Sequence, residues 1–351
     1  MSIQNKKNQQ KNQQNDQQDV LENVSQVKNY PMSIAPMMDR TDRHYRYMMR
    51  KITKKTLLYT EMITAKAILH GKRELLLGYD SSEHPISLQI GGDDPKEMAE
   101  CAKIAEDYGY DEVNLNIGCP SPRVTSGNFG ACLMTQPEVV AECVSEMKAV
   151  CTIPVTVKHR IGVDDVDRYE DMLRFIDIVS QAKSDRFSIH ARKAWLQGLS
   201  PKQNRNVPPL RHQEVYDVKK VFPHLLIEIN GGIKTHVDCR LHLQHVDAVM
   251  IGREAYDNPW LYADVDELYF GAEPNSITRS DVAMEMIPYI ERELQKGSKM
   301  MSITRHMLNL FKGERGGRIW RRKVGTLSAK GQTDVEALHQ VIVEIQRSKA
   351  S

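Results

Sequence analysis

The sequence predicts an α/β fold: a (β/α)8 TIM barrel followed by a small all-helical C-terminal domain. From about residue 32, short apolar or β-branched runs alternate with longer amphipathic runs, which is the pattern of right-handed βαβ units around a parallel sheet. Eight such units fall within about 240 residues, a length typical of this barrel. A doubly wound sheet is the alternative, but no GxGxxG motif follows the first expected strand. After about residue 275, helical patterns continue without strands between them.

The expected strands and helices follow from this alternation and are given in chain order. The eight strands are Ser33–Ala35, Leu57–Thr60, Ile86–Ile90, Glu112–Asn116, Val155–Lys158, Phe187–His190, Leu226–Ile229 and Ala248–Ile251. Proline at the first turn marks two barrel helices, Pro95–Tyr108 with Asp94 as N-cap and Pro137–Val150. The later helices are Asp281–Lys296, Ile303–Lys312 and Val335–Lys349.

Three segments follow from this pattern. Residues 1–29 are rich in Gln and Asn and predict a disordered tail. Residues 30–274 are expected to form the barrel, and residues 275–351 the helical domain.

Composition limits the partners and the cellular compartment that can be expected for the protein. The 351 residues carry a formal net charge of +2, which neither requires nor excludes a polyanionic partner. No apolar run approaches the roughly 18 residues of a membrane span, and no secretory signal opens the chain.

The six cysteines form no Cys-x-x-Cys pair and no Cys/His cluster with zinc spacing. We expect a cytoplasmic protein with reduced thiols, no metal and no membrane association. Its oligomeric state is open, with a monomer expected.

The active site of such a barrel lies at the C-terminal ends of the strands, and nearly every expected strand ends in polar or glycine-rich residues. Glycine loops follow the seventh and eighth strands at 230–232 and 252–253. Loops at these places often bind phosphate through backbone N–H groups, and Arg253 adds charge. Glycine pairs alone are usually turns, but two at the expected strands favour a phosphorylated cofactor or substrate.

Lys158 ends an apolar strand and has three interpretations. It is a Schiff-base lysine, as in barrel aldolases, or a fixed cation that stabilises the anionic reduced form of a flavin, or a solvated strand-end lysine. Gln89 and Asn116 suit the flavin interpretation, because amides bond the carbonyl and N–H groups of the ring. His190 is a candidate ligand to ring or phosphate, although a lone histidine is more often structural.

Cys119 stands between Gly118 and Pro120, directly after the fourth expected strand. By composition it is one of six thiols that are expected in the core. Its place at a strand end moves it to the barrel mouth, opposite the glycine loops.

Basic residues gather in two blocks. From Lys296 to Lys330 the chain carries ten Lys or Arg residues against one acid, Glu314, and no acid occurs from Arg192 to Gln213. A solvated basic face is the alternative, but it would normally intersperse acids. The two blocks therefore favour a nucleic-acid partner.

Ordered motifs in the chain resemble those of the tRNA-dihydrouridine synthases. They are APMMDRTDRHYR, LYTEM, LQIGG, VNLNIGCPSPRV, GNFGACLM, VTVKHRIG, INGGI and MIGREAYDNPW. Two more, IHARKAWLQGLSPKQNR and ITRHMLNLF with RIWRR, are similar to the A subfamily in particular. The resemblance runs from about residue 31 to about residue 325.

This resemblance implies an FMN-dependent enzyme that reduces the C5–C6 bond of uridines 20 and 20a in the tRNA D-loop, with NADPH as reductant. Its proton donor falls on Cys119. Carried over by motif, the flavin-binding residues are Ala35, Pro36, Met37, Gln89, Lys158, His190, Asn230, Gly231, Gly232, Gly252 and Arg253. The tRNA-binding residues are Asn116, Lys202, Arg205, Arg318 and Arg321.

The chemistry of uracil reduction agrees with an acid at Cys119. The reaction needs a hydride at C6, from N5 of the reduced flavin, and a proton at C5 from an acid on the opposite side of the base. A cysteine with an unperturbed pKa of about 8.5 is mostly protonated near neutrality. A nucleophilic cysteine would instead need a neighbour such as histidine to lower its pKa, and none is adjacent in sequence. The target base must also leave the RNA stack.

Three alternatives remain at this stage. The first is a flavin barrel that reduces a free pyrimidine or another small enone, which the basic C-terminal helices disfavour. The second is a barrel aldolase that uses Lys158 and would be colourless. The third is a non-catalytic RNA-binding protein, in which Cys119 would be dispensable.

Overall fold

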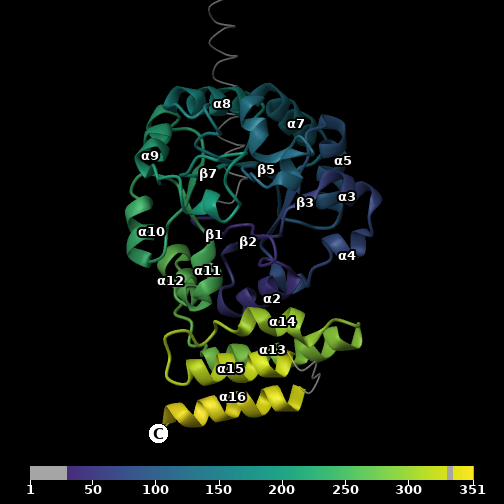
Figure 1. Ribbon diagram of the computed structural model, residues 1–351, viewed down its shortest axis with the longest axis vertical. Coiled ribbons are helices and arrows are strands. Elements are labelled where there is room, and N and C mark those ends of the chain that lie inside the picture. Colours follow the sequence, from purple (N-terminus) through teal and green to yellow (C-terminus); the bar gives the residue numbers. More distant parts are fainter. Residues whose placement is uncertain (1–29, 330–334, 351) are drawn as a thin grey trace, which may run out of the picture. The chain divides into compact units, whose positions relative to one another are not determined.

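Eight parallel strands close into a barrel, which lies in the upper part of Figure 1. The computed structural model describes residues 30–329 and 335–350. The tail predicted at 1–29 lies outside the described residues, as does Lys330, the last cation of the C-terminal basic block. The strands are β1 Met32–Ile34, β2 Leu57–Tyr59, β4 Ile86–Gly91, β5 Glu112–Ile117, β6 Val155–Arg160, β7 Phe187–His190, β8 Ile227–Asn230 and β9 Ala248–Ile251. Pairing of β2 with β4 closes the circle, and the short β3 (Ile63–Thr64) also pairs with β4. The predicted TIM barrel is confirmed.

Helices surround the strands, as α3, α5, α7, α8, α9 and α10 show in Figure 1. The helices of the barrel region are α2 Arg43–Ile52, α3 Ala65–His70, α4 Arg73–Leu77, α5 Pro95–Asp107, α6 Pro122–Thr125, α7 Pro137–Val150, α8 Tyr169–Gln181, α9 His212–Val221, α10 His236–His242, α11 Arg253–Asp257 and α12 Val265–Phe270. The predicted N-cap of α5 is confirmed, since Asp94 accepts bonds from the N–H groups of Lys96 and Glu97.

Four helices follow the barrel without an intervening strand in the described residues. They are α13 Arg279–Gln295, α14 Met300–Met307, α15 Gly317–Ala329 and α16 Val335–Ala350. The sequence pattern missed α15, because its glycines and its run of Arg and Lys interrupt the apolar period. The division into two domains near residue 275 stays a prediction, because the described residues from 31 onward cluster as one unit.

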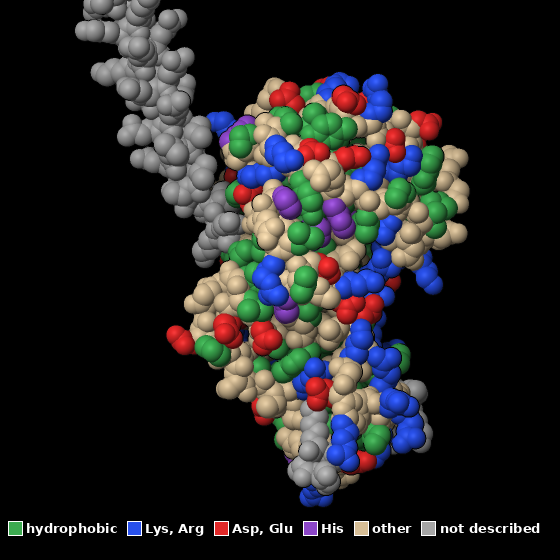
Figure 2. Space-filling view, turned by 90° about the vertical axis from the view of Figure 1, so that its left-hand side faces the viewer, with side chains coloured by type: hydrophobic (Ala, Val, Ile, Leu, Met, Phe, Trp, Pro, Cys, Tyr) green, Lys and Arg blue, Asp and Glu red, His purple; other side chains and the backbone are tan. Residues whose placement is uncertain are grey.

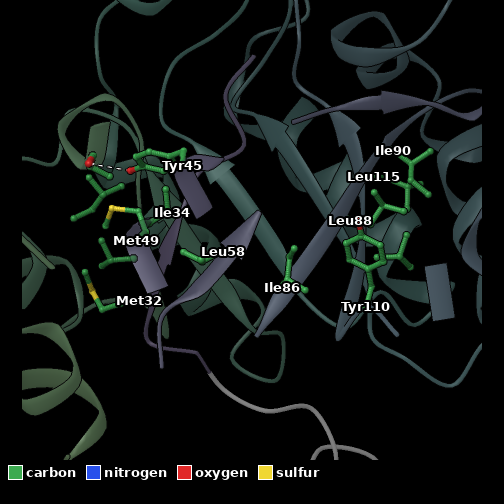
Figure 3. Packing of buried hydrophobic residues seen from close by; sticks show 14 of the residues in the cluster. Met32, Ile34, Tyr45, Met49, Leu58, Ile86, Leu88, Ile90, Tyr110 and Leu115 are labelled. Atoms are coloured by element: carbon green, nitrogen blue, oxygen red, sulfur yellow. Dashed lines mark hydrogen bonds between the residues drawn. The ribbon is translucent and has the colours of Figure 1, made fainter. Parts of the chain in front are cut away.

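The outward faces of the strands are apolar and pack under the helices. Along β5, for example, Val113, Leu115 and Ile117 are buried in the same cluster as Met98 and Ala102 of α5. Figure 3 shows part of this cluster, and its dashed line marks the bond from the Tyr45 hydroxyl to the carbonyl of Ala255. Burial of this large apolar surface is the main driving force for closing the barrel.

The inside of the barrel is polar, and Arg186 lies there between two glutamates. Its guanidinium donates to the carboxylate of Glu112 and to the Tyr59 hydroxyl at 2.9 Å, and its Nε lies 3.7 Å from Glu228. Tyr59, Glu112 and Glu228 belong to β2, β5 and β8. Side chains of strands that are not neighbours meet only across the barrel interior. Each of the four side chains belongs to a residue that is at most 2 % exposed.

Asp42 connects the barrel to the helices that follow it. One carboxylate oxygen caps α2 by accepting from the N–H groups of His44 and Tyr45, both at 3.0 Å. The other oxygen accepts from Arg305 at 2.5 Å and pairs with His306 at 2.9 Å. Although burial opposes it, these bonds hold the pKa of the Asp42 carboxyl well below its usual range. One side chain thus joins a helix of the barrel to α14.

Within the described residues, no helix is both long enough and apolar enough to cross a membrane.

Replacing Arg186 tests whether the interior network supports the fold. Arg186→Met is expected to lower the free energy of unfolding by about 3–5 kcal/mol, because Glu112 and Glu228 would remain buried without their cation. Urea unfolding followed by circular dichroism measures this loss.

The matched control is Arg168→Met. Arg168 also pairs with a carboxylate, that of Asp171, but its side chain is 75 % exposed, so its loss should change stability little. Equal midpoints for the two variants would show that the buried network does not stabilise the barrel.

Candidate active site

A ladder of hydrogen bonds crosses the barrel interior and ends at Cys119. Thr156 donates to Glu112 at 2.8 Å, and Asn114 donates to Thr156 at 2.8 Å. Gln89 then donates to Asn114 at 2.8 Å, and Asn116 donates to Gln89 at 2.8 Å. Each amide uses its N–H end and its carbonyl end, so the orientation of every side chain in the ladder is determined.

Asn116, the last residue of the ladder, holds the loop that carries Cys119. The side-chain carbonyl of Asn116 accepts from the backbone N–H of Gly118 at 3.1 Å and of Cys119 at 2.9 Å. On the other side, Arg160 donates through Nε to the carbonyl of Gly118 at 2.8 Å. The peptide before Cys119 is therefore fixed from both sides. Ala131 completes the turn by donating its N–H to the carbonyl of Cys119 at 3.0 Å.

The thiol of Cys119 is half-buried. Burial raises its pKa, while a backbone bond from Ser121 and the positive charges of Arg160, Arg205 and Lys158 oppose that rise. The net shift is upward, so the thiol keeps its proton near neutrality. Such a group is a better proton donor than nucleophile.

Lys158, His190 and the glycine loop after β8 meet at the same end of the barrel. The Lys158 ammonium donates to the side-chain carbonyl of Asn230 at 3.3 Å, and Asn230 donates to the carbonyl of Met250 at 2.8 Å. Burial and the nearby charge of Arg160 lower the pKa of Lys158 to about 8. Burial, with Arg160 and Lys158, also lowers the pKa of His190 well below its usual value. His190 is therefore neutral at neutral pH.

Gly231 lies directly against His190. It has φ +119°, and a Cβ at this position would come within 2.8 Å of the His190 ring. Only glycine fits this backbone and this approach. Gly232, with φ +79°, likewise approaches Leu210, where a Cβ would meet Cδ1 at 2.4 Å.

The loops after β1 and β9 also adjoin. Ala35 donates its N–H to the carbonyl of Ile251 at 2.9 Å. A Cβ built on Gly252 would meet Ala35 at 3.7 Å and Met37 at 4.0 Å, in ordinary contact, and Pro36 lies between those two residues. The structure thus brings the residues predicted from motifs on the first and last strands next to each other.

The residues predicted to bind tRNA lie in three places. Lys202 and Arg205 are exposed on the loop after β7. Arg253 reaches this loop and donates to Asn206 at 2.6 Å and to the carbonyl of Arg205 at 3.2 Å. Arg318 and Arg321 are exposed on α15, where Arg321 donates a hydrogen bond to Asn309. Asn116, the fifth such residue, lies in the ladder next to Cys119.

The two basic blocks are partly neutralised. In the C-terminal block, ion pairs engage four cations: Lys296 with Glu293, Arg305 with Asp42, Lys312 with Glu254, and Lys323 with Glu344. In the block that follows β7, Lys193 and Arg211 both pair with the carboxylate of Asp167, at 3.0 Å and 3.7 Å. Figure 2 still shows Lys and Arg side chains gathered along one edge of the lower part of the molecule.

Arg160 is a further candidate for the site and is not among the residues predicted from the sequence. Its guanidinium is buried and donates to three backbone carbonyls, those of Gly118, Lys193 and Asn204. It thereby joins the Cys119 loop to the loop after β7. The two-residue period of a strand could have found it, since Arg160 lies on the same face as Lys158. The same period places Asn114 beside Asn116.

Within the part of the chain that the structure describes, histidines, cysteines and carboxylates do not gather into a metal site. The described residues contain no group of three such side chains that could hold an ion. His159 points away from the mouth, since its ring packs on Phe175 of α8 with centroids 4.9 Å apart.

The geometry defines a class of protein, a TIM barrel whose C-terminal strand ends bring together a held thiol, a buried lysine and glycine loops. Comparison with known proteins identifies the family. The family model described as "Dihydrouridine synthase (Dus)" matches residues 33–348. The chain belongs to the dihydrouridine synthase family, as its motifs predict.

Curated relatives cover nearly the whole chain. A tRNA-dihydrouridine(20/20a) synthase of Synechocystis sp. is 55 % identical over 89 % of this chain and 93 % of its own. Proteins of the same name from Vibrio cholerae and Escherichia coli are each 53 % identical, over 90 % and 89 % of this chain and 96 % and 95 % of their own.

Among solved structures, a complex of 2-naphthoyl-CoA reductase with 2-naphthoyl-CoA matches with a TM-score of 0.51 and 12 % identity. The match covers 69 % of this chain and about half, 51 %, of that chain. At this identity it supports the barrel fold alone.

The raised pKa of Cys119 predicts slow alkylation. Because the thiolate is the reactive form, iodoacetamide should modify Cys119 at pH 7.5 more slowly than a free thiol, and the midpoint of the rate against pH should lie above the free-thiol value of about 8.5. Peptide mass spectrometry of the full-length protein measures the extent of modification at Cys119 over time.

A second variant tests the cause of the shift. Arg160→Met removes a positive charge that opposes the rise, so the rate profile should move to higher pH. A wild-type midpoint below about pH 8.5 would contradict the protonated thiol.

Proposed function

We propose that this chain reduces the C5–C6 double bond of uridines 20 and 20a in the tRNA D-loop, with FMN as cofactor and NADPH as reductant. The coarser statement, an oxidoreductase that forms dihydrouridine in tRNA, follows from membership of the family. That membership excludes the aldolase and the non-catalytic RNA-binding protein. The observation that carries the finer proposal is the fixed loop of Cys119, which faces the same barrel end as Lys158 and the glycine loops.

The residues present suit an FMN site. Gly231 and Gly232 form a cradle in which a Cβ would collide with His190 and Leu210, and glycine N–H groups can approach a phosphate closely. Arg253 supplies a cation at the neighbouring loop. Gln89 offers an amide whose orientation the ladder determines, and Lys158 offers an ammonium at the edge expected for the flavin ring.

The chain's own residues then perform the proton transfer. When bound, the flavin supplies the hydride for C6 of the uracil. Cys119 donates its proton to C5, because burial keeps the thiol protonated at neutral pH. Asn116 and Arg160 hold the peptide of Cys119 while the proton moves. Neutral His190 can donate or accept one hydrogen bond without adding a charge.

The tRNA is bound by two basic surfaces. Lys202 and Arg205 rim the barrel mouth, while Arg318 and Arg321 lie on α15. Phosphate contacts of this kind make binding dependent on salt. A free pyrimidine or small enone would need none of them, so turnover on undermodified tRNA compared with free uridine separates these two substrates. We also propose that the enzyme acts in the cytoplasm as a monomer.

Removing the acid should stop reduction without disturbing binding. Cys119→Ala is expected to lower the rate of uridine reduction by about 10²–10⁴-fold, because it removes the side chain that donates the proton. Mass spectrometry of dihydrouridine in tRNA measures the product. The flavin absorbance and tRNA binding should match wild type, and near-normal turnover would refute the proton-donor role.

Removing a cation from α15 should weaken tRNA binding alone. Arg318→Ala is expected to reduce the slope of log Kd against log salt by about one phosphate contact, with the flavin retained. Filter binding over a salt series measures the slope. The matched control Arg174→Ala removes an exposed cation of α8 and should leave the slope unchanged. Loss of flavin from Arg318→Ala would show that this residue is structural instead.

A further inference from the structure

Lys158, Ser188 and Glu228 form one row across three neighbouring strands. In the register of the sheet, Lys158 of β6 is paired with Ser188 of β7, and Ser188 with Glu228 of β8. The contacts of all three side chains are with interior groups. The row therefore connects the lysine at the barrel mouth with a carboxylate deeper in the barrel.

Glu228 is held in place by two hydroxyl groups. Ser33 of β1 donates to Oε1 at 2.6 Å, and Ser188 donates to Oε2. The side chain is completely buried. Its position is thus determined by β1, β7 and β8 together.

The charge of Glu228 is only partly balanced by Arg186. The guanidinium of Arg186 donates its hydrogen bonds to Glu112 and Tyr59, while its Nε lies 3.7 Å from Glu228 without forming a hydrogen bond. Two carboxylates therefore share one guanidinium. A buried carboxylate is stable only when its charge is compensated, and Lys158 is the next cation along the row.

The charged and titratable groups that act on Lys158 come from four places. Arg160 and His159 lie on β6, His190 at the end of β7, Glu228 on β8 and Cys119 after β5. Arg160 repels the ammonium charge, His159 and His190 are neutral, and the Cys119 thiol keeps its proton. Among the described groups that act on Lys158, Glu228 is thus the carboxylate that favours its charged form.

We propose that Glu228 is a positioning residue of the active site, a buried counter-ion that keeps Lys158 protonated so that a fixed positive charge faces the flavin. This inference rests on the proposed flavin site, because it assigns the lysine its electrostatic role there. The balance is sensitive, since a pKa of about 8 leaves Lys158 only about one unit above neutral pH. Without Glu228, a neutral lysine would face the cofactor.

The titration of Lys158 tests this inference directly. In the full-length protein labelled with 13C at lysine Cε, NMR follows each lysine over pH 6–10, and the resonance lost in Lys158→Met identifies Lys158. Wild type should titrate near pH 8. In Glu228→Gln the midpoint should fall by about one pH unit or more, a tenfold loss of proton affinity, because the isosteric amide keeps the shape and loses the charge.

A control separates charge from structure. Glu83 is likewise a buried glutamate paired with an arginine, Arg46, at 2.7 Å, but it lies outside the row. Glu83→Gln should reduce stability and leave the midpoint of Lys158 unchanged. An unchanged midpoint in folded Glu228→Gln would overturn the proposal.

A second variant retains Glu228 and covers a failure of Glu228→Gln to fold. Glu112→Gln/Arg186→Gln removes the paired charges as a unit, so Glu228 loses its guanidinium and the midpoint of Lys158 should rise. A midpoint that stays or falls would overturn the proposal. The flavin spectrum of the same samples tests the proposed function separately. A colourless protein in which Glu228→Gln still shifts Lys158 would refute the flavin site and support the pairing.

Discussion

The guanidinium of Arg186, shared between Glu112 and Glu228 inside the barrel, is the interaction on which the rest of the site depends. A barrel interior filled with branched apolar side chains would be the usual solution. Here the interior is polar, and a buried polar group is costly unless it is hydrogen-bonded or paired with an opposite charge. Hydrogen bonds of this kind fix the orientation of Tyr59, Thr156 and the two glutamates. These side chains therefore form a rigid scaffold inside the barrel.

Two sets of contacts connect this scaffold with the groups that are proposed to act in the reaction. From Glu112, the ladder through Asn114 and Gln89 reaches Asn116 and the loop of Cys119. From Glu228, the cross-strand row reaches Lys158. The acid and the cation on which the proposed chemistry depends are therefore held by one network. A site with tightly held neighbours loses little free energy to reorganisation when a substrate binds.

The helices after the barrel are joined to it by charge as well as by packing. Asp42 caps α2 and binds Arg305 and His306 of α14, and Trp320 of α15 is completely buried and donates to the carbonyl of Met307 at 2.8 Å. Some of the basic residues in this region are thus structural, which the count of charges alone did not indicate. The cations that stay exposed on α15 are the ones available to a phosphate backbone.

The sequence by itself determined the barrel, the order of its strands, the strand ends that carry the site and, through its motifs, the family. Local periodicity and ordered motifs encode those features. It predicted that Cys119, Lys158 and the glycine loops lie at one end. Tertiary structure alone decided that Arg160 holds the Cys119 loop, that Asn116 faces Gln89, and that Glu228 lies in line with Lys158. The residues concerned are far apart in the chain, 27 positions for Asn116 and Gln89 and 42 positions for Arg160 and Gly118. Their geometry is set only when the sheet closes and interior side chains compete for the same partners.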